Sequence, residues 1–227
     1  MKRFTKEEMF TPLEDEVTIP IDFEMHNFDF TRKWFLSRNI KTWSTFLPLK
    51  YSNERPINML QIGVFEGMDL VWCMQHIAGH PDSRVFAIDP WAATNKLDHV
   101  YMEGVYQRAQ RNLSPWISRI CLMRGYSDSV MELMKHGAQH NKTIIYPDGW
   151  DLIVVDGDHT ADAVYTDARL AFDLIKPGGW VIFDDVRNRV EKKDHVVHGL
   201  ERFVDNQTDY ALKFEWAHRY CDCWSKI

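Results

Sequence analysis

Five short apolar runs, separated by longer amphipathic segments, are the feature of this sequence that most restricts its fold. The runs cover residues 57–63, 84–89, 119–125, 151–156 and 179–185, and segments with helical spacing lie between them at 67–79, 98–113, 127–137 and 160–175. Buried strands that alternate with helices are typical of parallel βαβ units. The alternation therefore predicts an open α/β sheet with helices on both of its faces.

The two ends of the chain extend this pattern. Residues 1–30 read as an extended arm, and a helix is expected over 31–47, where Leu36, Ile40, Trp43 and Leu47 share one face. "KPGG", residues 176–179, reads as a helix stop and a tight turn. A further helix is expected at 196–206, and two more strands at about 210–216 and 219–226.

The predicted fold is therefore a Rossmann-like, doubly wound, seven-stranded and mostly parallel sheet with an N-terminal helical extension. We expect two parts: residues 1–55 as an arm and helix, and residues 56–227 as the α/β domain. A chain of 227 residues is long enough for one such domain with a full core.

Composition narrows the class of partner. The net charge is -6, whereas a nucleic-acid-binding face is usually basic, so a nucleic-acid partner is unlikely on this reading. No segment approaches the roughly 20 apolar residues of a membrane span. The charged N-terminus does not resemble a secretory signal, and the four scattered cysteines do not have zinc-site spacing. A reduced, cytoplasmic protein without a membrane partner is expected.

Ligands of open α/β sheets bind at the carboxyl ends of the strands. Gly63 and Gly67 frame a turn after the first run, where backbone amides can meet a ligand, or where the chain simply turns tightly. Phe65 stands where a dinucleotide fingerprint requires glycine, which disfavours a nicotinamide cofactor. Asp89 follows the second run, where a carboxylate can hold ribose hydroxyls or cap a turn. Ser127, after the third run, can line an adenine or cap a helix.

Acidic residues follow the fourth and fifth runs. Asp156, Asp158 and His159 lie in "DGDH", and Asp184 and Asp185 lie in "FDD". Adjacent parallel strands end at the same level, so these carboxylates are expected to converge and to repel one another without a cation. A divalent ion with oxygen ligands resolves this repulsion. The alternative to a metal site is that one acid caps a helix, another is solvated, and His159 makes an ordinary hydrogen bond in a loop.

Taken together, the glycine turn, the acid after the second run, "DLIVVDGDH" and "IKPGGWVIFDD" resemble the class I S-adenosylmethionine (SAM)-dependent methyltransferases. Within them, the sequence is most similar to the metal-dependent O-methyltransferase branch, which includes macrolide-sugar and catechol-type enzymes. The resemblance covers about residues 55–205. One residue departs from it: Gln61 stands where the family commonly has Glu or Asp, so a contact to the amino-acid end of the cofactor loses its charge.

The resemblance implies a role for particular residues. Cofactor contacts are expected from Gln61, Gly63, Gly67, Asp89, Trp91, Tyr126, Ser127 and Asp158. Asp156, Asp184 and Asp185 match the metal ligands, with Mg²⁺ as the expected ion, and His159 matches the general base of the sugar-modifying members.

The resulting prediction is a SAM-dependent, Mg²⁺-dependent O-methyltransferase acting on a hydroxyl of a small molecule such as a sugar, a polyketide or another natural product. The ion would lower the pKa of the hydroxyl, and His159 would accept its proton. The alternatives are a metal-independent or nucleic-acid methyltransferase and, in another class, a non-catalytic cofactor-binding partner protein.

The aromatic N-terminal segment is expected to pack or to act as a lid, and residues 187–195 are a candidate substrate gate. The sequence leaves open whether the protein forms a homo-oligomer.

Overall fold

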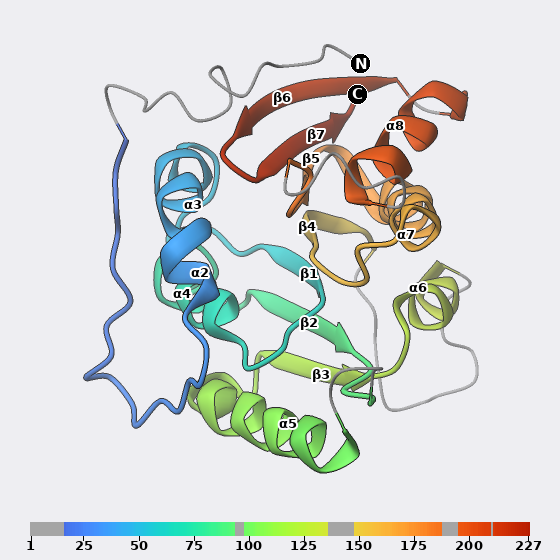
Figure 1. Cartoon of the computed structure of the whole chain (residues 1–227). Coiled ribbons are helices and arrows are strands. Elements are labelled where there is room, and N and C mark those ends of the chain that lie inside the picture. The colour runs from blue at the N-terminus through green and yellow to red at the C-terminus, as the bar shows by residue number, and fades with distance from the viewer. Residues whose placement is uncertain (1–15, 94–97, 136–147, 188–194, 210) are drawn as a thin grey trace. The chain divides into compact units, whose positions relative to one another are not determined.

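The computed structural model describes residues 16–93, 98–135, 148–187, 195–209 and 211–227. Seven strands form one sheet in the order β3-β2-β1-β4-β5-β7-β6. Its pairs are parallel from β1 to β3 and between β4 and β5, and antiparallel where β7 meets β5 and β6. The predicted seven-stranded, mostly parallel α/β fold is confirmed (Figure 1).

The chain divides into two compact units, which are described separately. Among the described residues, the first comprises residues 16–126, and the second comprises those from Ser127 to Ile227. The described part of the N-terminal segment belongs to the same compact unit as the first three strands. The expected division into residues 1–55 and 56–227 stays a prediction.

The first unit is built on three parallel strands and the helices that follow them (Figure 1). Its elements are β1 (Asn58–Ile62), α4 (Met68–His76), β2 (Arg84–Asp89), α5 (His99–Leu113), a 3-10 turn (Ser114–Trp116) and β3 (Ile120–Arg124). The apolar residues of β1 and β2 are almost completely buried. Asp89 and Arg124 are opposite each other in the register, so β2 and β3 end at the same level.

The N-terminal part of this unit corrects one prediction. Instead of one helix over 31–47, the structure has α2 (Trp34–Arg38), α3 (Ile40–Phe46) and a 3-10 turn (Leu47–Leu49), with a break at Asn39. The predicted apolar face is largely buried, since Ile40, Trp43 and Leu47 all lie in the core, while Leu36 is half-buried. The spacing found the buried residues but not the interruption.

Residues 16–33 run along the helices of the first unit without regular structure of their own. The backbone of this segment is hydrogen-bonded to helix side chains: Trp72 donates to the carbonyl of Ile19, and the amide of Asp29 donates to Asn112. Phe28 stacks on Trp116 at a ring distance of 6.4 Å. The described part of the arm is therefore a packed segment.

The described residues of the second unit form four strands and three helices. Its elements are α6 (Ser127–Lys135), β4 (Trp150–Val155), α7 (Ala161–Leu174), β5 (Ile175–Phe183), α8 (Val196–Asn206), β6 (Leu212–His218) and β7 (Cys221–Lys226). Helix α7 packs against α6 and α8, and contacts β4 and β5. The bounds of α8 agree with the predicted helix over 196–206.

The segment "KPGG" differs from its prediction as a tight turn. Helix α7 ends at Leu174 as expected, but residues 175–179 already belong to β5. The register with β4 shifts here, because Trp150 pairs with Ile175 and Leu152 with Trp180. Extra residues on one strand form a bulge, and Gly178 adopts a φ of 75° within it.

Candidate functional site

The first unit places the predicted glycine turn between β1 and α4, at residues 63–67, here called the glycine loop. Gly63 and Gly67 have φ values of 79° and 77°, in the left-handed region that side chains disfavour. A side chain at Gly67 would also approach Leu113 of α5 to 3.0 Å. Both glycines are thus required by the loop itself. Phe65 between them has a φ of 51°, and its ring lies 5.0 Å from that of Trp34.

Asp89, at the end of β2, holds the glycine loop in place. Its Oδ2 accepts hydrogen bonds from the amides of Val64 (2.9 Å) and Phe65 (3.0 Å), and its Oδ1 accepts one from the amide of Trp91 (2.7 Å). The sequence predicted this carboxylate as a ribose ligand. The structure shows that it also shapes the loop, which is a role that strand spacing does not reveal.

Trp91 lies beneath the glycine loop. Its side chain is 1 % exposed, and its indole Nε1 donates to the carbonyl of Phe65 at 2.9 Å. Its ring contacts that of Tyr106 at 4.7 Å. Trp91 therefore supports the loop from below and presents almost no surface to a ligand in this structure.

Gln61, the residue that departs from the family pattern, is fully buried in β1. Its Nε2 donates to the carbonyl of Gly63 at 3.0 Å and to Oδ2 of Asp69 at 2.6 Å. Asp69 lies in the first turn of α4, where a negative charge is favoured by the helix dipole. Asp69 was not among the predicted site residues.

Glu66, in the middle of the glycine loop, was also missed by sequence reasoning. Its buried carboxylate accepts hydrogen bonds from both the amide and the hydroxyl of Thr31, at 2.7 Å each, and pairs with Nε of Arg108 at 2.6 Å. Asn112 donates to the Glu66 carbonyl at 2.9 Å. Glu66 thus connects the loop to α5 and to the N-terminal segment. The one signal in the sequence was an acid between two glycines.

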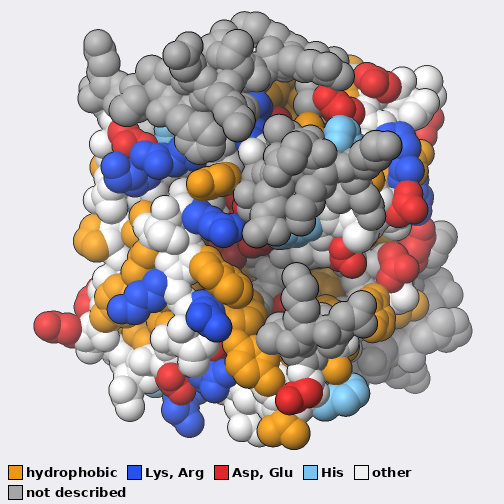
Figure 2. Space-filling view, in the orientation of Figure 1, with side chains coloured by type: hydrophobic (Ala, Val, Ile, Leu, Met, Phe, Trp, Pro, Cys, Tyr) orange, Lys and Arg blue, Asp and Glu red, His pale blue; other side chains and the backbone are white. Residues whose placement is uncertain are grey.

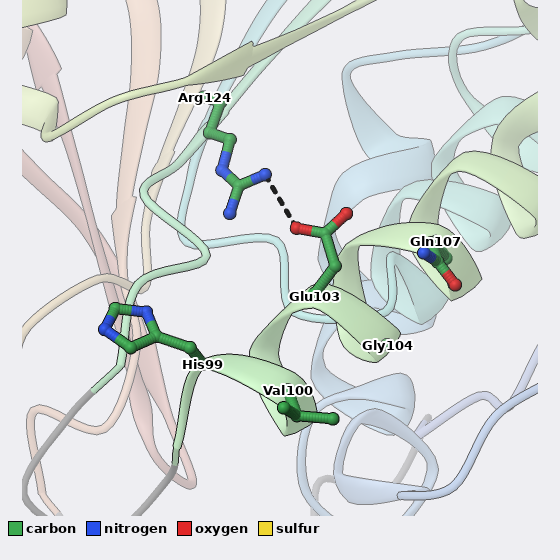
Figure 3. Close-up of a pocket in the computed structure, with 6 residues that line it drawn as sticks. All are labelled: His99, Val100, Glu103, Gly104, Gln107 and Arg124. Atoms are coloured by element: carbon green, nitrogen blue, oxygen red, sulfur yellow. Dashed lines mark hydrogen bonds and ion pairs between the residues drawn. The ribbon is translucent and has the colours of Figure 1, made fainter.

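Beyond β3, Tyr126 is 66 % exposed, as a residue that borders a ligand can be. A hollow of about 630 Å³ lies nearby in this unit, between Arg124 and the first half of α5. Figure 3 shows Arg124 and Glu103 pointing toward each other across it, joined at 2.9 Å. The other lining residues are His99, Val100, Gly104 and Gln107. None was predicted, because the face of α5 carries no motif.

In the second unit, Ser127 begins α6. Its hydroxyl donates to Oδ1 of Asp167 at 2.6 Å. Asp167 lies on the buried face of α7, and desolvation by burial raises the pKa of its carboxyl to about 7. The hydroxyl predicted to border the cofactor therefore has a partner within the protein. The sequence signal that was missed is Asp167 itself, an acid on the otherwise apolar face of the helix predicted at 160–175.

His159 lies between two of the predicted acids of the second unit. Its Nε2 is 3.5 Å from Oδ1 of Asp156, and its Nδ1 is 3.6 Å from Oδ2 of Asp185. The hydrogen bond with Asp156 raises the pKa of the imidazole above its usual 6.5, against the opposing effect of burial. The charges of the neighbouring carboxylates raise the pKa of His159 further. The structure thus brings together the predicted general base and two predicted carboxylates.

Asp184, the third predicted metal ligand, has a different neighbour. Its Oδ1 accepts a hydrogen bond from the Cys221 thiol at 3.1 Å. Next to that cysteine on β7, Asp222 is fully buried and paired with Arg187. Desolvation raises the pKa of the Asp222 carboxyl to about 6, although Arg187 acts in the opposite direction. Cys221, Asp222 and Arg187 were not predicted as neighbours of the site.

Asp158 shapes the turn before α7. Its Oδ1 accepts a hydrogen bond from the amide of Thr160 at 2.8 Å, and Thr160 in turn caps the helix. The side chain is exposed. In this structure Asp158 therefore shapes the turn by accepting the Thr160 amide.

The predicted metal site is not supported by the described part of the chain. Within the residues described, no group of three or more His, Cys, Asp or Glu side chains is placed to hold a metal ion. Asp156 and Asp185 face an imidazole, and Asp184 faces a thiol. Among the described residues, His159 is a partner of Asp156 and Asp185, and its raised pKa favours the charged imidazole.

The surface in view carries charges of both signs. Figure 2 shows Lys and Arg side chains interspersed with Asp, Glu and apolar ones over the coloured part of this face. This mixture agrees with the net charge of -6. In the parts of the chain that the structure covers, no helix has the length and apolar character needed to cross a membrane.

Solved structures similar to this chain share its fold. An O-methyltransferase from Bacillus cereus in complex with SAH has a TM-score of 0.57 and 17% identity, and the match covers 82% of this chain and 80% of that one. The O-methyltransferase TomG from Streptomyces achromogenes, involved in tomaymycin synthesis and solved with SAM, has a TM-score of 0.54 and 14% identity over 82% and 78% of the two chains. An rRNA methylase from Streptococcus thermophilus has a TM-score of 0.53 and 10% identity over 84% and 97%.

Sequence comparison gives the family. The uncharacterized protein R132 of Acanthamoeba polyphaga mimivirus is 23% identical over 132 residues, which are 58% of this chain and 52% of that protein. The chain thus spans about half the length of this relative. The model of the methyltransferase domain family Methyltransf_24 matches residues 60–186, more than half of the chain. The chain belongs to this methyltransferase domain family, which confirms the resemblance to class I SAM-dependent methyltransferases.

Proposed function

We propose that this protein is a SAM-dependent O-methyltransferase that acts on a hydroxyl group of a small molecule. The observation that carries the proposal is the glycine loop, whose two left-handed glycines and Asp89-bound amides form a hydrogen-bonded turn at the end of β1. Membership of the methyltransferase domain family supports it. Two similar structures are O-methyltransferases solved with SAM or with SAH.

The residues of the first unit fit this cofactor. Gly63 has no side chain that would keep a ligand from the backbone of the glycine loop, whereas Gly67 lets the loop pack against Leu113. The side-chain oxygen of the buried Gln61 has no hydrogen-bond partner among the described residues, so a donor is missing beside the loop. When bound, SAM supplies a methyl group on a positively charged sulfur. Asp89, beside its bonds to the loop, is the residue that we assign to the ribose hydroxyls, with Tyr126 beside the adenine.

In the second unit, we assign His159 as the group that accepts the proton of the acceptor hydroxyl. A neutral hydroxyl is a poor nucleophile, and a base within hydrogen-bond reach makes it reactive as the methyl group transfers. Asp156 and Asp185 flank the imidazole on its two nitrogen atoms. The acceptor hydroxyl would take the place of one carboxylate at its nitrogen, which receives the proton, while the other carboxylate holds the ring. Both carboxylates stabilise the imidazolium that forms.

The Mg²⁺ ion stays a prediction from the sequence and has no step in this mechanism. The donors assigned to it, Asp156, Asp184 and Asp185, face His159 and Cys221 in the described structure. A cytoplasmic location and a homo-oligomer likewise stay predictions.

A small-molecule acceptor is favoured over a nucleic acid by the net charge of -6, since neutralising phosphates requires a basic surface. The similarity to an rRNA methylase concerns the fold and not the acceptor. The described part of the N-terminal segment contributes Trp34 beside Phe65 of the glycine loop, which makes this segment a candidate wall of the acceptor site.

Turnover tests this function. The full chain is incubated with SAM and a panel of phenols, catechols and sugars. SAH, which forms when SAM gives up its methyl group, is quantified by mass spectrometry. We expect SAH formation that depends on one class of hydroxyl acceptor. His159→Ala is expected to lower kcat by about 100-fold or more, the usual contribution of a positioned base, while SAH affinity is retained.

Parallel reactions with excess EDTA and with added Mg²⁺ decide the metal question. Loss of turnover in EDTA with recovery by Mg²⁺ would establish the metal dependence that the sequence predicts. Full turnover in His159→Ala would contradict the assigned base. Methylation of RNA, and of none of the small acceptors, would replace the proposed acceptor class.

A further inference from the structure

Trp34, the first residue of α2, is an exposed indole beside the glycine loop. It is 53% exposed, whereas Trp43, Trp72 and Trp91 of the same unit are buried. Its ring contacts that of Phe65 at a centroid distance of 5.0 Å and an interplanar angle of 35°. Indole rings have a large apolar face, on which another planar ring stacks favourably. Trp34 therefore offers a stacking surface next to the loop.

Hydrogen bonds on both sides of Phe65 fix its position in the loop. Its amide donates to Asp89 at 3.0 Å, and its carbonyl accepts from the indole of Trp91 at 2.9 Å. Its φ of 51° lies in a region that a bulky side chain rarely adopts unless its surroundings impose it. The half-buried Phe65 ring is thus presented to Trp34 from a backbone that is held on both sides.

Two cations come directly before Trp34. Arg32 and Lys33 are both exposed, and within the described residues neither side chain is in an ion pair with an acid. The carboxylate of Glu66, which accepts the amide of Arg32, is buried and paired with Arg108. A local excess of positive charge therefore lies next to the exposed indole, in a chain whose net charge is -6.

The backbone that carries these cations is tied to the glycine loop. The amides of Thr31 and Arg32 donate to Oε2 of Glu66 at 2.7 and 3.4 Å, and the hydroxyl of Thr31 donates to Oε1 at 2.7 Å. Glu66 directly follows Phe65 in the loop. Two rings and two cations are thus brought to one place on the first unit, here called the Trp34 surface: Arg32, Lys33, Trp34 and Phe65.

We propose that the Trp34 surface selects an aromatic acid as the methyl acceptor: a molecule with a planar ring and a negatively charged group. This proposal rests on the proposed function, since it concerns the molecule that carries the acceptor hydroxyl. The ring would stack on the indole of Trp34, and the acidic group would pair with Arg32 or Lys33. Neutral sugars provide neither feature, so the proposal narrows the class of acceptor.

Two probes that differ by one charge test the proposal on the full chain. Dihydroxyphenylacetate and its amide, both catechols, share the ring and the hydroxyls, and their methylene group keeps the side group from altering hydroxyl acidity. Their dissociation constants are measured by ligand-observed NMR without cofactor, so the result does not depend on turnover. We expect the acid to bind about 3- to 10-fold more tightly than the amide, and this preference to shrink at high salt.

Three variants identify the groups responsible. Arg32→Gln, Lys33→Gln removes both charges, and we expect it to bind the acid and the amide equally. Trp34→Leu should weaken both probes about 3-fold or more, and Trp34→Phe should retain most of the affinity.

Arg55→Gln is the matched control, because Arg55 is an exposed cation three residues before β1, whereas the glycine loop follows that strand. We expect this variant to keep the preference for the acid. Thermal unfolding of every variant, followed by circular dichroism, confirms that it is folded.

Several results would overturn the proposal. Among them are equal binding of the acid and the amide by the wild-type chain, binding of neither probe, and an unchanged preference in the double variant. Unchanged affinity in Trp34→Leu would show that the ring does not stack there. If the double variant loses SAH affinity but keeps the preference for the acid, the two cations serve the cofactor instead.

Failure of the proposed function has a different signature. If the acid binds as expected and no acceptor yields SAH, the chain is not the proposed methyltransferase, and the Trp34 surface binds aromatic acids in another role. If SAH does form, kcat/KM should favour the acid over the amide by a similar factor, and the reverse order would overturn the proposal.

Discussion

At the scale of single residues, the carboxylates at the ends of β2, β4 and β5 and the one on β7 have different hydrogen-bond donors. Asp89 accepts from backbone amides, whereas Asp184 accepts from a thiol and Asp222 pairs with a guanidinium. Asp156 and Asp185 share the imidazole of His159. The protein therefore offsets this negative charge locally, and each partner sets the chemistry available to its acid.

Asp167 gives a prediction about pH and stability. Burial raises the pKa of its carboxyl to about 7 from a usual value of 3.8; nearby Asp128 and Asp158 add to the shift, and the hydroxyl of Ser127 opposes it. At a pH between these two pKa values, Asp167 is protonated in the folded state and ionised in the unfolded chain. The stabilisation is therefore complete below about pH 4 and is lost as the pH rises through about 7.

The variant Asp167→Asn keeps an acceptor for Ser127 and removes the titration. We expect it to be more stable than the wild type at pH 8, by roughly 2–4 kcal/mol at about 1.4 kcal/mol per pKa unit, with a flatter pH dependence between pH 4 and 7. Urea unfolding at a series of pH values measures this, with Asp162→Asn on the same helix as an exposed control. Parallel pH curves for the wild type and Asp167→Asn would contradict the prediction.

At the scale of elements, the glycine loop takes its shape from the segments around it. Strand β2 contributes Asp89, and helix α5 contributes Arg108 and the close contact of Leu113 with Gly67. The N-terminal segment contributes Thr31, which donates twice to the carboxylate of Glu66. The loop is thus held from three directions, and Glu66 is the residue through which two of them act.

Glu66→Gln tests this connection. The substitution keeps an oxygen for Thr31 but removes the charge that pairs with Arg108, so we expect the free energy of unfolding to fall by about 1–3 kcal/mol. Trypsin should then cut faster after Arg32 and Lys33, because the amides of Thr31 and Arg32 are hydrogen-bonded to Glu66. SAH affinity should fall as well, since the loop is less well held.

Asp29→Asn is the matched control. Asp29 lies in the same N-terminal segment, and the substitution breaks its exposed ion pair with Arg111 of α5. Such an exposed pair contributes less than about 1 kcal/mol to stability. If trypsin cuts Glu66→Gln and Asp29→Asn at the same rate, Glu66 does not anchor the segment.

At the scale of the whole molecule, the family match runs across both compact units. It covers residues 60–186, whereas the units divide between Tyr126 and Ser127. The glycine loop and Asp89 belong to the first unit, and His159 with its two carboxylates belongs to the second. Residues of both units are assigned to the proposed reaction, so it is tested on the full chain.

Much of this arrangement could be predicted from the sequence, because strand and helix periods are local signals. The spacing predicted the bounds of α8 and placed Asp89 at the end of β2. The break at Asn39 could not be predicted, since the apolar spacing continues through it. Residues distant in sequence were the main limit: the partner of Ser127 is 40 positions away, and that of Asp184 is 37. Converging acids predicted a cation, but the spacing could not show that His159 would lie between two of them.

The central claim is that the glycine loop and Asp89 bind SAM. Isothermal titration of SAH into the full chain, compared with Asp89→Asn, tests it most directly. We expect one-site binding by the wild type and affinity lower by about tenfold or more in the variant, because a single amide oxygen cannot accept all three of the backbone bonds that Asp89 holds. No measurable heat of binding for either SAH or SAM with the folded wild-type chain would contradict the claim.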